Sequence, residues 1–334
     1  MNRRLFLQSA SGLFVSATTL GLANAAHAAS APASQAEILY AAAAAEAPVK
    51  LPQKANLKTS FGLLTDIHYS TAPVRTIPAE DSVRVYAHSL PKMRQAIDVF
   101  NSRNLDFAVE LGDFKDCLDE GNRAETIGFL QTVESEYQRF NGPRYHVCGN
   151  HDFDRISLGD YLANTENAGD AKGKTYYAFR QGGIKFIVLD ACHNNAAGEH
   201  YSLGHLDWTV AIVPDEELAW LEKELADGTE PVVVFTHQLL NTWDEKPQNI
   251  PHPFFIHNAN RVVEILEKSR RVLAVFSGHF HKGAYSEKNG IHYVVLQGLV
   301  ERPMPHNVAA MVHIAKDDTI YVEGLWNERS HTCA

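Results

Sequence analysis

Five short polar motifs, each directly after an apolar run, hold most of the residues in this sequence that could do chemistry. They are Asp66-Ile67-His68, Gly112-Asp113, Gly149-Asn150-His151-Asp152, Thr236-His237 and Gly278-His279-Phe280-His281. Carboxylate, amide and imidazole groups of this kind bind divalent ions such as Mn, Fe or Zn. Imidazole also transfers protons near neutral pH. Together the motifs predict one site that combines metal binding with proton transfer.

The apolar runs before these motifs have the length of buried strands. They cover residues 61–65, 105–111, 145–148, 232–236 and 272–277. Ligands in open α/β sheets bind at the carboxyl ends of strands, which is where the motifs fall. Helical periodicity is found at 83–103, 123–140, 215–226 and 258–269, and further strands are expected at 176–180, 185–190, 292–297, 308–314 and 319–323. The pattern predicts a layered α/β sandwich of two sheets flanked by helices, in one domain over residues 58–334.

The amino terminus has the order of an export signal. Paired arginines, Arg3 and Arg4, precede a weakly apolar stretch at 11–23, and a small-residue cleavage site ends at Ala28. Residues 1–28 therefore resemble a twin-arginine signal peptide, followed by an Ala-rich linker at 29–57. This predicts a periplasmic or secreted protein. Since no other segment approaches the roughly 20 apolar residues of a membrane span, we expect no stable membrane insertion of the mature chain.

Composition narrows the function classes. The 334 residues include 30 Lys and Arg against 40 Asp and Glu, a formal charge of -10. This acidity argues against a nucleic-acid partner, because such binding needs a basic surface. The 17 histidines are an excess, and only some of them lie in the motifs. The four cysteines allow either free thiols or a Cys117–Cys148 bridge, and the oligomeric state is left open.

The five motifs, in this order, resemble the calcineurin-like metallophosphoesterase superfamily over residues 60–300. Beyond the last motif, the stretch from Gly283 through Gly298 to Glu301 is similar to manganese-dependent ADP-ribose/CDP-alcohol diphosphatases and related phosphodiesterases. His68 stands where that group often has Gln, and Asp152 stands where Glu is common. The resemblance implies a four-layer α-β-β-α sandwich of two mixed sheets flanked by helices.

The resemblance also implies a site with two divalent metal ions, Mn being favoured over Fe or Zn. The implied ligands are Asp66, His68 and His281 for the first ion, Asp113 for the bridging position, and Asn150, His237 and His279 for the second ion. His151 would contact the phosphate and protonate the leaving oxygen. Asp116 and Asp152 would orient the histidines, and we therefore expect His151 and Asp152 to be the catalytic residues.

The function that follows is an exported binuclear phosphoesterase that acts by in-line attack of metal-bound hydroxide. Its partner would be a small-molecule phosphodiester or diphosphate, of the nucleotide-diphosphate or glycerophosphodiester type. A phosphomonoesterase and a non-catalytic metal-binding protein are the alternatives. Two insertions, 190–215 and 241–257, carry aromatic and amide side chains that would either select the substrate or simply pack.

Overall fold

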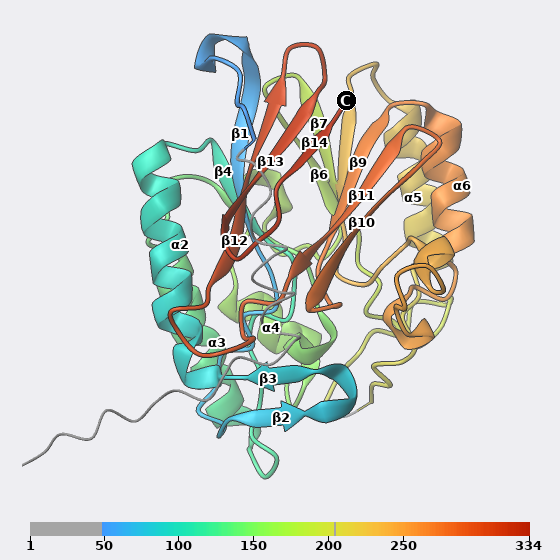
Figure 1. Ribbon diagram of the computed structural model, residues 1–334. Helices are drawn as coiled ribbons and strands as arrows, with labels where there is room; N and C mark the ends of the chain where they lie inside the picture. Colours follow the sequence, from blue (N-terminus) through green and yellow to red (C-terminus); the bar gives the residue numbers. More distant parts are fainter. Residues whose placement is uncertain (1–48, 204) are drawn as a thin grey trace, which may run out of the picture. The chain divides into compact units, whose positions relative to one another are not determined.

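The computed structural model describes residues 49–203 and 205–334. Within this part of the chain, two six-stranded sheets face each other, and helices cover their outer faces (Figure 1). The predicted four-layer sandwich of two mixed sheets is thus confirmed. The predicted signal peptide at 1–28 and most of the predicted linker at 29–57 lie outside the described residues.

The first sheet has the strand order β14-β13-β12-β1-β4-β5. Its strands are β1 (Leu57–Leu64), β4 (Phe107–Glu110), β5 (Arg144–His146), β12 (Val308–Ala315), β13 (Ile320–Trp326) and β14 (His331–Cys333). Strands β1, β4 and β5 are parallel, whereas β12 joins β1 in antiparallel register and continues antiparallel to β13 and β14. The parallel half therefore carries the first three motifs at one edge.

The second sheet has the order β10-β11-β9-β8-β7-β6. Its strands are β6 (Tyr177–Gln181), β7 (Ile184–Val188), β8 (Val232–Phe235), β9 (Val272–Ser277), β10 (Lys282–Lys288) and β11 (Ile291–Gln297). Strands β7, β8, β9 and β11 are parallel, and β6 and β10 are antiparallel edge strands. Because both faces of the central strands are covered, all residues of β7 and β8 are buried. This explains the continuous apolar sequence of β8 and that of β7 apart from Lys185.

An aromatic cluster fills the space between the sheets. The ring of Phe61 in β1 stacks on Phe107 with centroids 4.7 Å apart. Its edge contacts reach the opposite sheet at Phe186, Phe235 and Phe276, with centroid distances of 5.5, 5.8 and 6.2 Å. All five side chains are buried. These contacts tie β1 to the second sheet, and they involve strands β1, β4, β8 and β9, which end in the motifs.

Helices pack on the outer faces (Figure 1). Those on the first sheet are α2 (Ser89–Arg103), α3 (Arg123–Tyr137) and α4 (Leu158–Asn164), and those on the second are α5 (Asp215–Ala226) and α6 (Ala259–Ser269). The Asn122 side chain caps α3 by accepting the Glu125 N–H. Short 3₁₀ turns occupy Lys54–Asn56, Pro78–Glu80, Tyr86–His88, Asn150–Phe153, Gly169–Ala171, Thr242–Asp244 and His252–Phe254.

The predicted helix at 83–103 begins later than expected. Residues Ser82–Arg84 form strand β3, which pairs with β2 (Arg75–Ile77) in a small hairpin. The Val83 N–H donates to the Glu301 carboxylate at 2.8 Å, so a contact distant in sequence holds this segment extended. Periodicity in the sequence did not reveal that contact, and the prediction for residues 83–88 was wrong.

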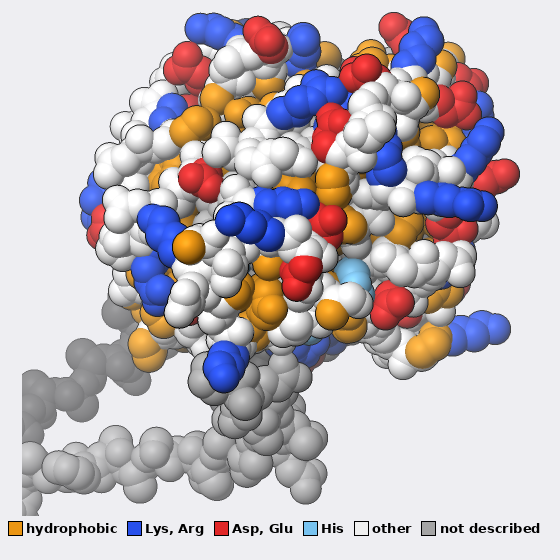
Figure 2. All heavy atoms as spheres, turned by 90° about the horizontal axis from the view of Figure 1, so that it is seen from above, with side chains coloured by type: hydrophobic (Ala, Val, Ile, Leu, Met, Phe, Trp, Pro, Cys, Tyr) orange, Lys and Arg blue, Asp and Glu red, His pale blue; other side chains and the backbone are white. Residues whose placement is uncertain are grey.

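Charges of both signs are interspersed on the face seen in Figure 2. Among the described residues, no helix is both long enough and apolar enough to cross a bilayer. All four cysteines are free thiols, which settles the predicted alternatives in favour of no bridge. Three of them are buried, and Cys117 is half-buried.

Candidate metal centre

Loops at the carboxyl ends of five parallel strands bring the predicted ligands together. Asp66 and His68 follow β1, Asp113 follows β4, Asn150 follows β5, His237 follows β8, and His279 and His281 follow β9. Six of these seven side chains belong to buried residues, and His281 is half-buried. Strands of two different sheets thus converge on one site, as the spacing of the motifs predicts.

The ligand atoms form two groups. In the first group, Asp66 Oδ1 lies 3.1 Å from His281 Nε2 and 3.8 Å from His68 Nε2. The second group consists of Asp113, His237 and His279, whose nearest ligand atoms all lie within 4.8 Å of one another. Asp113 Oδ2 lies 3.2 Å from His237 Nε2 and 3.4 Å from His68 Nε2. The Asp113 carboxylate therefore stands between the groups, in the position of a bridging ligand.

Several of these buried atoms make no hydrogen bond. They are Asp66 Oδ1, Asn150 Oδ1, His237 Nε2 and His279 Nε2. Leaving a buried polar atom without a partner costs about 1–3 kcal/mol each. Divalent ions bound by mixed nitrogen and oxygen donors would satisfy all four atoms at once. The residues present therefore fit divalent metal ions.

Each histidine in the first group has its other ring nitrogen held by a carboxylate. His68 Nδ1 lies 3.2 Å from Asp116 Oδ2, and His281 Nδ1 lies 2.6 Å from Glu301 Oε1. In the second group, His237 Nδ1 donates to the Leu111 carbonyl at 2.7 Å. These bonds fix the tautomer, so that each Nε2 presents its lone pair to the ligand group. The role of Asp116 was predicted, whereas Glu301 was missed.

The carboxylates and imidazoles of the site stabilise each other's charged forms. Burial alone would raise the pKa of Asp113, but His237, His151 and His68 hold it well below its usual value. Burial alone would lower the pKa of His281, but Asp66 and Glu301 raise it to about 9. Without metal, His281 therefore holds a proton at neutral pH, and binding of a metal ion must displace that proton.

Strained backbone accompanies the ligands. Asp66, His68, Asp113 and His279 have φ values of 51°, 47°, 55° and 65°. Non-glycine residues in this left-handed region cost about 1–3 kcal/mol each and cluster at functional sites. The strain at the first motif is held by hydrogen bonds from Asp66 N to Gly112 O at 3.0 Å and from His68 N to Asp113 O at 2.8 Å.

Two glycines let these loops approach closely. A Cβ atom at Gly149 would collide with the backbone nitrogen of Asp113, and one at Gly278 would collide with the Thr65 hydroxyl. Glycine at both positions therefore permits the close approach of the backbone at the site.

His151 lies beside the first group, with its ring 4.8 Å from that of His68. Its Nδ1 is 2.6 Å from Asp154 Oδ2 and 3.7 Å from Asp116 Oδ1. Burial alone would lower the pKa of His151, but Asp154, Asp116 and Asp113 raise it to about 10. The protonated form is thus favoured, as a proton donor requires.

The expected role of Asp152 needs correction. Its carboxylate accepts backbone N–H groups from Asp113 at 3.1 Å, Phe114 at 2.9 Å and Gly149 at 2.9 Å. Asp152 therefore locks the second and third motif loops together, and Asp154 is the carboxylate that orients His151. In the 3₁₀ turn Asn150–Phe153, side chains three residues apart lie on the same side. That spacing is the signal that could have identified Asp154.

Aromatic side chains of both insertions lie beside the second group. The Phe254 ring is 5.0 Å from His279, and the Trp208 ring is 6.2 Å from it. Other insertion residues serve the fold, since His200 Nε2 pairs with buried Asp190 at 3.0 Å. The insertions therefore both pack and border the site.

A family model for calcineurin-like phosphoesterases matches residues 59–283. The chain belongs to the calcineurin-like phosphoesterase family. A "Manganese-dependent ADP-ribose/CDP-alcohol diphosphatase" of Oryza sativa is 24% identical over 302 residues, covering 79% of this chain and 90% of the relative. The protein of the same name in Arabidopsis thaliana is 25% identical over 284 residues, covering 73% and 87%.

Solved structures share the fold of this chain. A dimetal phosphatase from Danio rerio has a TM-score of 0.70 at 20% identity, over 83% of this chain and 99% of that one. A purple acid phosphatase from yellow lupin has a TM-score of 0.53 at 14% identity, over 80% and 51%. As a calcineurin-like phosphoesterase, the protein is a metal-dependent hydrolase that acts on phosphate esters, which confirms the predicted enzyme class.

Proposed function

We propose that the protein uses two divalent ions, preferably Mn, to hydrolyse a phosphodiester or diphosphate bond in a small molecule. The position of Asp113 carries this proposal, because Oδ2 lies within 3.4 Å of ring nitrogens from both ligand groups. Two ligand groups that share one carboxylate are typical of sites with two metal ions. The manganese dependence in the names of the relatives supports the choice of metal.

The chain's own residues bind the cations, orient the histidine side chains and transfer the proton. Divalent ions, when bound, supply the positive charge that neutralises phosphate oxygens and lowers the pKa of water. Asp66 and Asp113 are held ionised by the histidines around them, and so are ready to bind cations. His151 Nδ1 donates to Asp154, which leaves Nε2 to give its proton to the departing oxygen. Until that transfer, Asp154 stabilises the protonated form of the His151 ring.

A substrate panel tests this proposal. Mn-loaded protein is assayed on ADP-ribose, CDP-choline, a cyclic nucleotide and a glycerophosphodiester, with bis-p-nitrophenyl phosphate and p-nitrophenyl phosphate as a diester and monoester pair. We expect diester or diphosphate cleavage that Asp113→Ala abolishes and exposed Asp170→Ala retains. Full activity of folded Asp113→Ala, or cleavage of the monoester alone, would contradict the proposal. Stoichiometric metal binding with no turnover would indicate the non-catalytic alternative.

We also propose that the protein is exported by the twin-arginine route and cleaved after Ala28. The paired Arg3 and Arg4 and the small residues before Ala28 support this proposal. Fractionation of a bacterial host tests it, with amino-terminal sequencing of the exported protein. We expect the Arg3→Lys, Arg4→Lys double variant to accumulate uncleaved in the cytoplasm. Equal export of the double variant would overturn the route.

A further inference from the structure

A second cluster of possible metal ligands lies just beyond the carboxyl ends of strands β5 and β7. The sulfur of Cys148, a carboxylate oxygen of Asp190 and a ring nitrogen of His200 all lie within 4.8 Å of one another. Cys148 and Asp190 are buried, and the His200 side chain is 11% exposed. Thiolate, carboxylate and imidazole groups are the side-chain donors that zinc binds in proteins. None of the three residues belongs to the two ligand groups, so this cluster is separate from the metal centre.

Backbone contacts fix the positions of Asp190 and His200. The insertion that begins at Asp190 folds back on itself, so that His193 and His200 face each other in a short antiparallel pairing. The Tyr201 N–H donates to the Cys192 carbonyl at 2.9 Å in the same pairing. Asp190 Oδ1 accepts the Cys192 N–H at 2.9 Å, which leaves Oδ2 for His200 Nε2 at 3.0 Å.

The hydrogen bonds of His200 require a cation between its ring and Asp190. His200 Nδ1 donates to the Tyr201 carbonyl at 2.8 Å. In the neutral ring, Nε2 then carries a lone pair and faces a carboxylate oxygen, so two acceptors meet. Either a proton or a metal ion must lie between them. Nitrogen and oxygen ligands of a tetrahedral zinc ion lie about 3.3–3.5 Å apart, so a shift of a few tenths of an ångström admits the ion.

The net charge of the cluster is the same with two protons as with one divalent ion. With a neutral Cys148 thiol and a doubly protonated His200 ring, the imidazolium and the Asp190 carboxylate cancel. With Zn²⁺, the thiolate and the carboxylate together cancel the charge of the ion, and the ring is neutral. The ion can therefore replace the two protons without leaving an uncompensated charge in the buried interior, which would be costly.

Two atoms of this region make no hydrogen bond among the described residues. The Cys148 sulfur makes none, although the neighbouring Cys192 thiol donates to the Cys148 carbonyl at 3.4 Å. His193 Nδ1 is buried and also makes none, and its ring lies 4.8 Å from that of His200. A metal ion would give the sulfur a partner, and His193 adds a nearby donor for the fourth position of a tetrahedral site.

We propose that Cys148, Asp190 and His200 bind a structural zinc ion that fastens the first of the two insertions to the ends of β5 and β7. The ion is additional to the two divalent ions of the proposed function, and its thiolate ligand selects zinc over manganese. The same insertion carries Trp208, which borders the metal centre, so the ion fixes a loop beside that centre. The inference goes beyond the proposed function and does not depend on it.

Cobalt substitution gives a test that needs no turnover. Co²⁺ bound to a thiolate gives an intense charge-transfer absorption in the near ultraviolet, and the metal centre has only nitrogen and oxygen donors. Protein stripped of metal by a chelator is titrated with Co²⁺. We expect one equivalent per chain to produce the band, excess Zn²⁺ to remove it, and Mn²⁺, which binds such donors more weakly than Co²⁺, to leave it in place. Folded protein without the band at saturating Co²⁺ would show an ion pair alone and overturn the inference.

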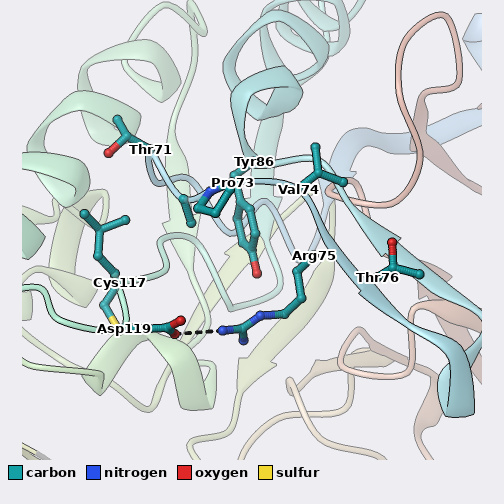
Figure 3. A pocket seen from close by; sticks show the side chains of 10 residues that line it. Thr71, Pro73, Val74, Arg75, Thr76, Tyr86, Cys117 and Asp119 are labelled. Carbon is teal, nitrogen blue, oxygen red and sulfur yellow. Dashed lines mark hydrogen bonds and ion pairs between the residues drawn. The ribbon is translucent and has the colours of Figure 1, made fainter. Parts of the chain in front are cut away.

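Cys117 needs a control of its own. It lines a cavity of about 510 Å³ beside the β2 segment (Figure 3). Its sulfur lies within 4.8 Å of carboxylate oxygens of Asp116 and Asp154, so this accessible thiol could bind Co²⁺ by itself. The titration is therefore repeated with Cys117→Ser, which should keep the band. Loss of the band in Cys117→Ser would assign it to that thiol and overturn the inference.

Variants then test the assigned ligands. Cys148→Ser should abolish the band, whereas Cys192→Ser, which removes an equally buried thiol of the same region, should keep it. The reverse result would show that the assignment is wrong. If Cys148→Ser does not fold, His200→Gln decides, because the loss of a ligand should weaken Co²⁺ binding at the band by more than about tenfold. A folded His200→Gln protein with wild-type affinity would contradict the proposal.

Asp113→Ala separates this inference from the proposed function. It removes the carboxylate between the two ligand groups, so hydrolysis should be lost while the charge-transfer band remains. Zn²⁺ added to Mn-loaded protein should also raise the Tm of wild type but not that of Cys148→Ser. Loss of the band in folded Asp113→Ala would place the cobalt in the metal centre and overturn the inference.

Discussion

Replacing Glu301 by Gln should weaken metal binding although Glu301 belongs to neither ligand group. Its Oε1 lies 2.6 Å from His281 Nδ1, and its Oε2 accepts the Val83 N–H at 2.8 Å. The Ser82 hydroxyl also donates to Oε1, at 2.5 Å. Glutamine keeps the shape of the side chain but has one acceptor oxygen and no charge. At least one of the three donors would lose its partner.

The size of the effect follows from these contacts. A hydrogen bond to a charged group contributes about 1.5–3 kcal/mol, and loss of a carboxylate behind a ligand histidine lowers metal affinity about 10–100-fold. Glu301 also raises the proton affinity of His281, whose pKa is about 9. Proton competition therefore masks part of the loss at pH 7. The loss should be larger at pH 8.5, where fewer protons compete.

Competition between the protein and a fluorescent chelator for Mn²⁺ measures the affinity at both pH values, and circular dichroism checks the fold. The control is Glu323→Gln, which alters another His–Glu pair, with Glu323 Oε2 3.4 Å from His313 Nε2 in strands β12 and β13. We expect Glu323→Gln to bind Mn²⁺ as wild type does. A folded Glu301→Gln protein with wild-type affinity at pH 8.5 would refute the reasoning.

Other predictions concern catalysis and stability. His151→Asn should lower kcat about 10²–10⁴-fold for esters with alkoxide leaving groups but much less for p-nitrophenyl esters, whose leaving group needs no proton; steady-state kinetics on both compares them. His146, buried between Glu110 and Glu134, has its pKa raised to about 10 by these carboxylates against the lowering effect of burial. The stabilisation is therefore complete below the unfolded-state pKa and is lost as pH rises toward 10. Urea unfolding between pH 7 and 9.5 should show His146→Gln losing about 1 kcal/mol per pH unit less than wild type, while the slope due to His151 and His281 remains. Phe61→Ala should cost about 3–5 kcal/mol of unfolding free energy, measured in the same way.

The strands that carry the motifs could be predicted because their signal is local. Each is a short apolar run that ends in a polar motif, and burial on both faces requires such a run. Strand β10 was missed because its sequence, Lys282–Lys288, is mostly polar. It is a strand only because it pairs antiparallel with β11, which is a contact between segments rather than a property of either. The late start of α2 has the same cause, since Glu301 holds the β3 segment from more than 200 residues away.

The site residues also divide into those with a local sequence signal and those identified only by contacts in the folded chain. The ligands lie within the motifs, each directly after a parallel strand, so the carboxyl ends of strands in both sheets bring them to one end of the sandwich. Glu301 was missed because it lies 20 residues after His281 and reaches it only through the turn beyond β11. Asp154 was missed for a different reason, because two acids follow His151 and only the geometry of the 3₁₀ turn decides between them.

The excess of histidine in an acidic chain has two physical uses, and the second ring nitrogen tells them apart. His68 and His281 each place one nitrogen on a carboxylate and turn the other toward the ligand group. His146 lies 2.8 Å from Glu110 through Nδ1 and 3.1 Å from Glu134 through Nε2, so it has no lone pair to offer a metal ion. The same pairing of imidazole with carboxylate therefore stabilises the buried core at His146 and prepares a ligand at His68 and His281. Carboxylates used in this way lie behind the histidines. A chain with a net charge of -10 can therefore turn cation-binding nitrogens, rather than bare negative charge, toward the place where a phosphate would bind.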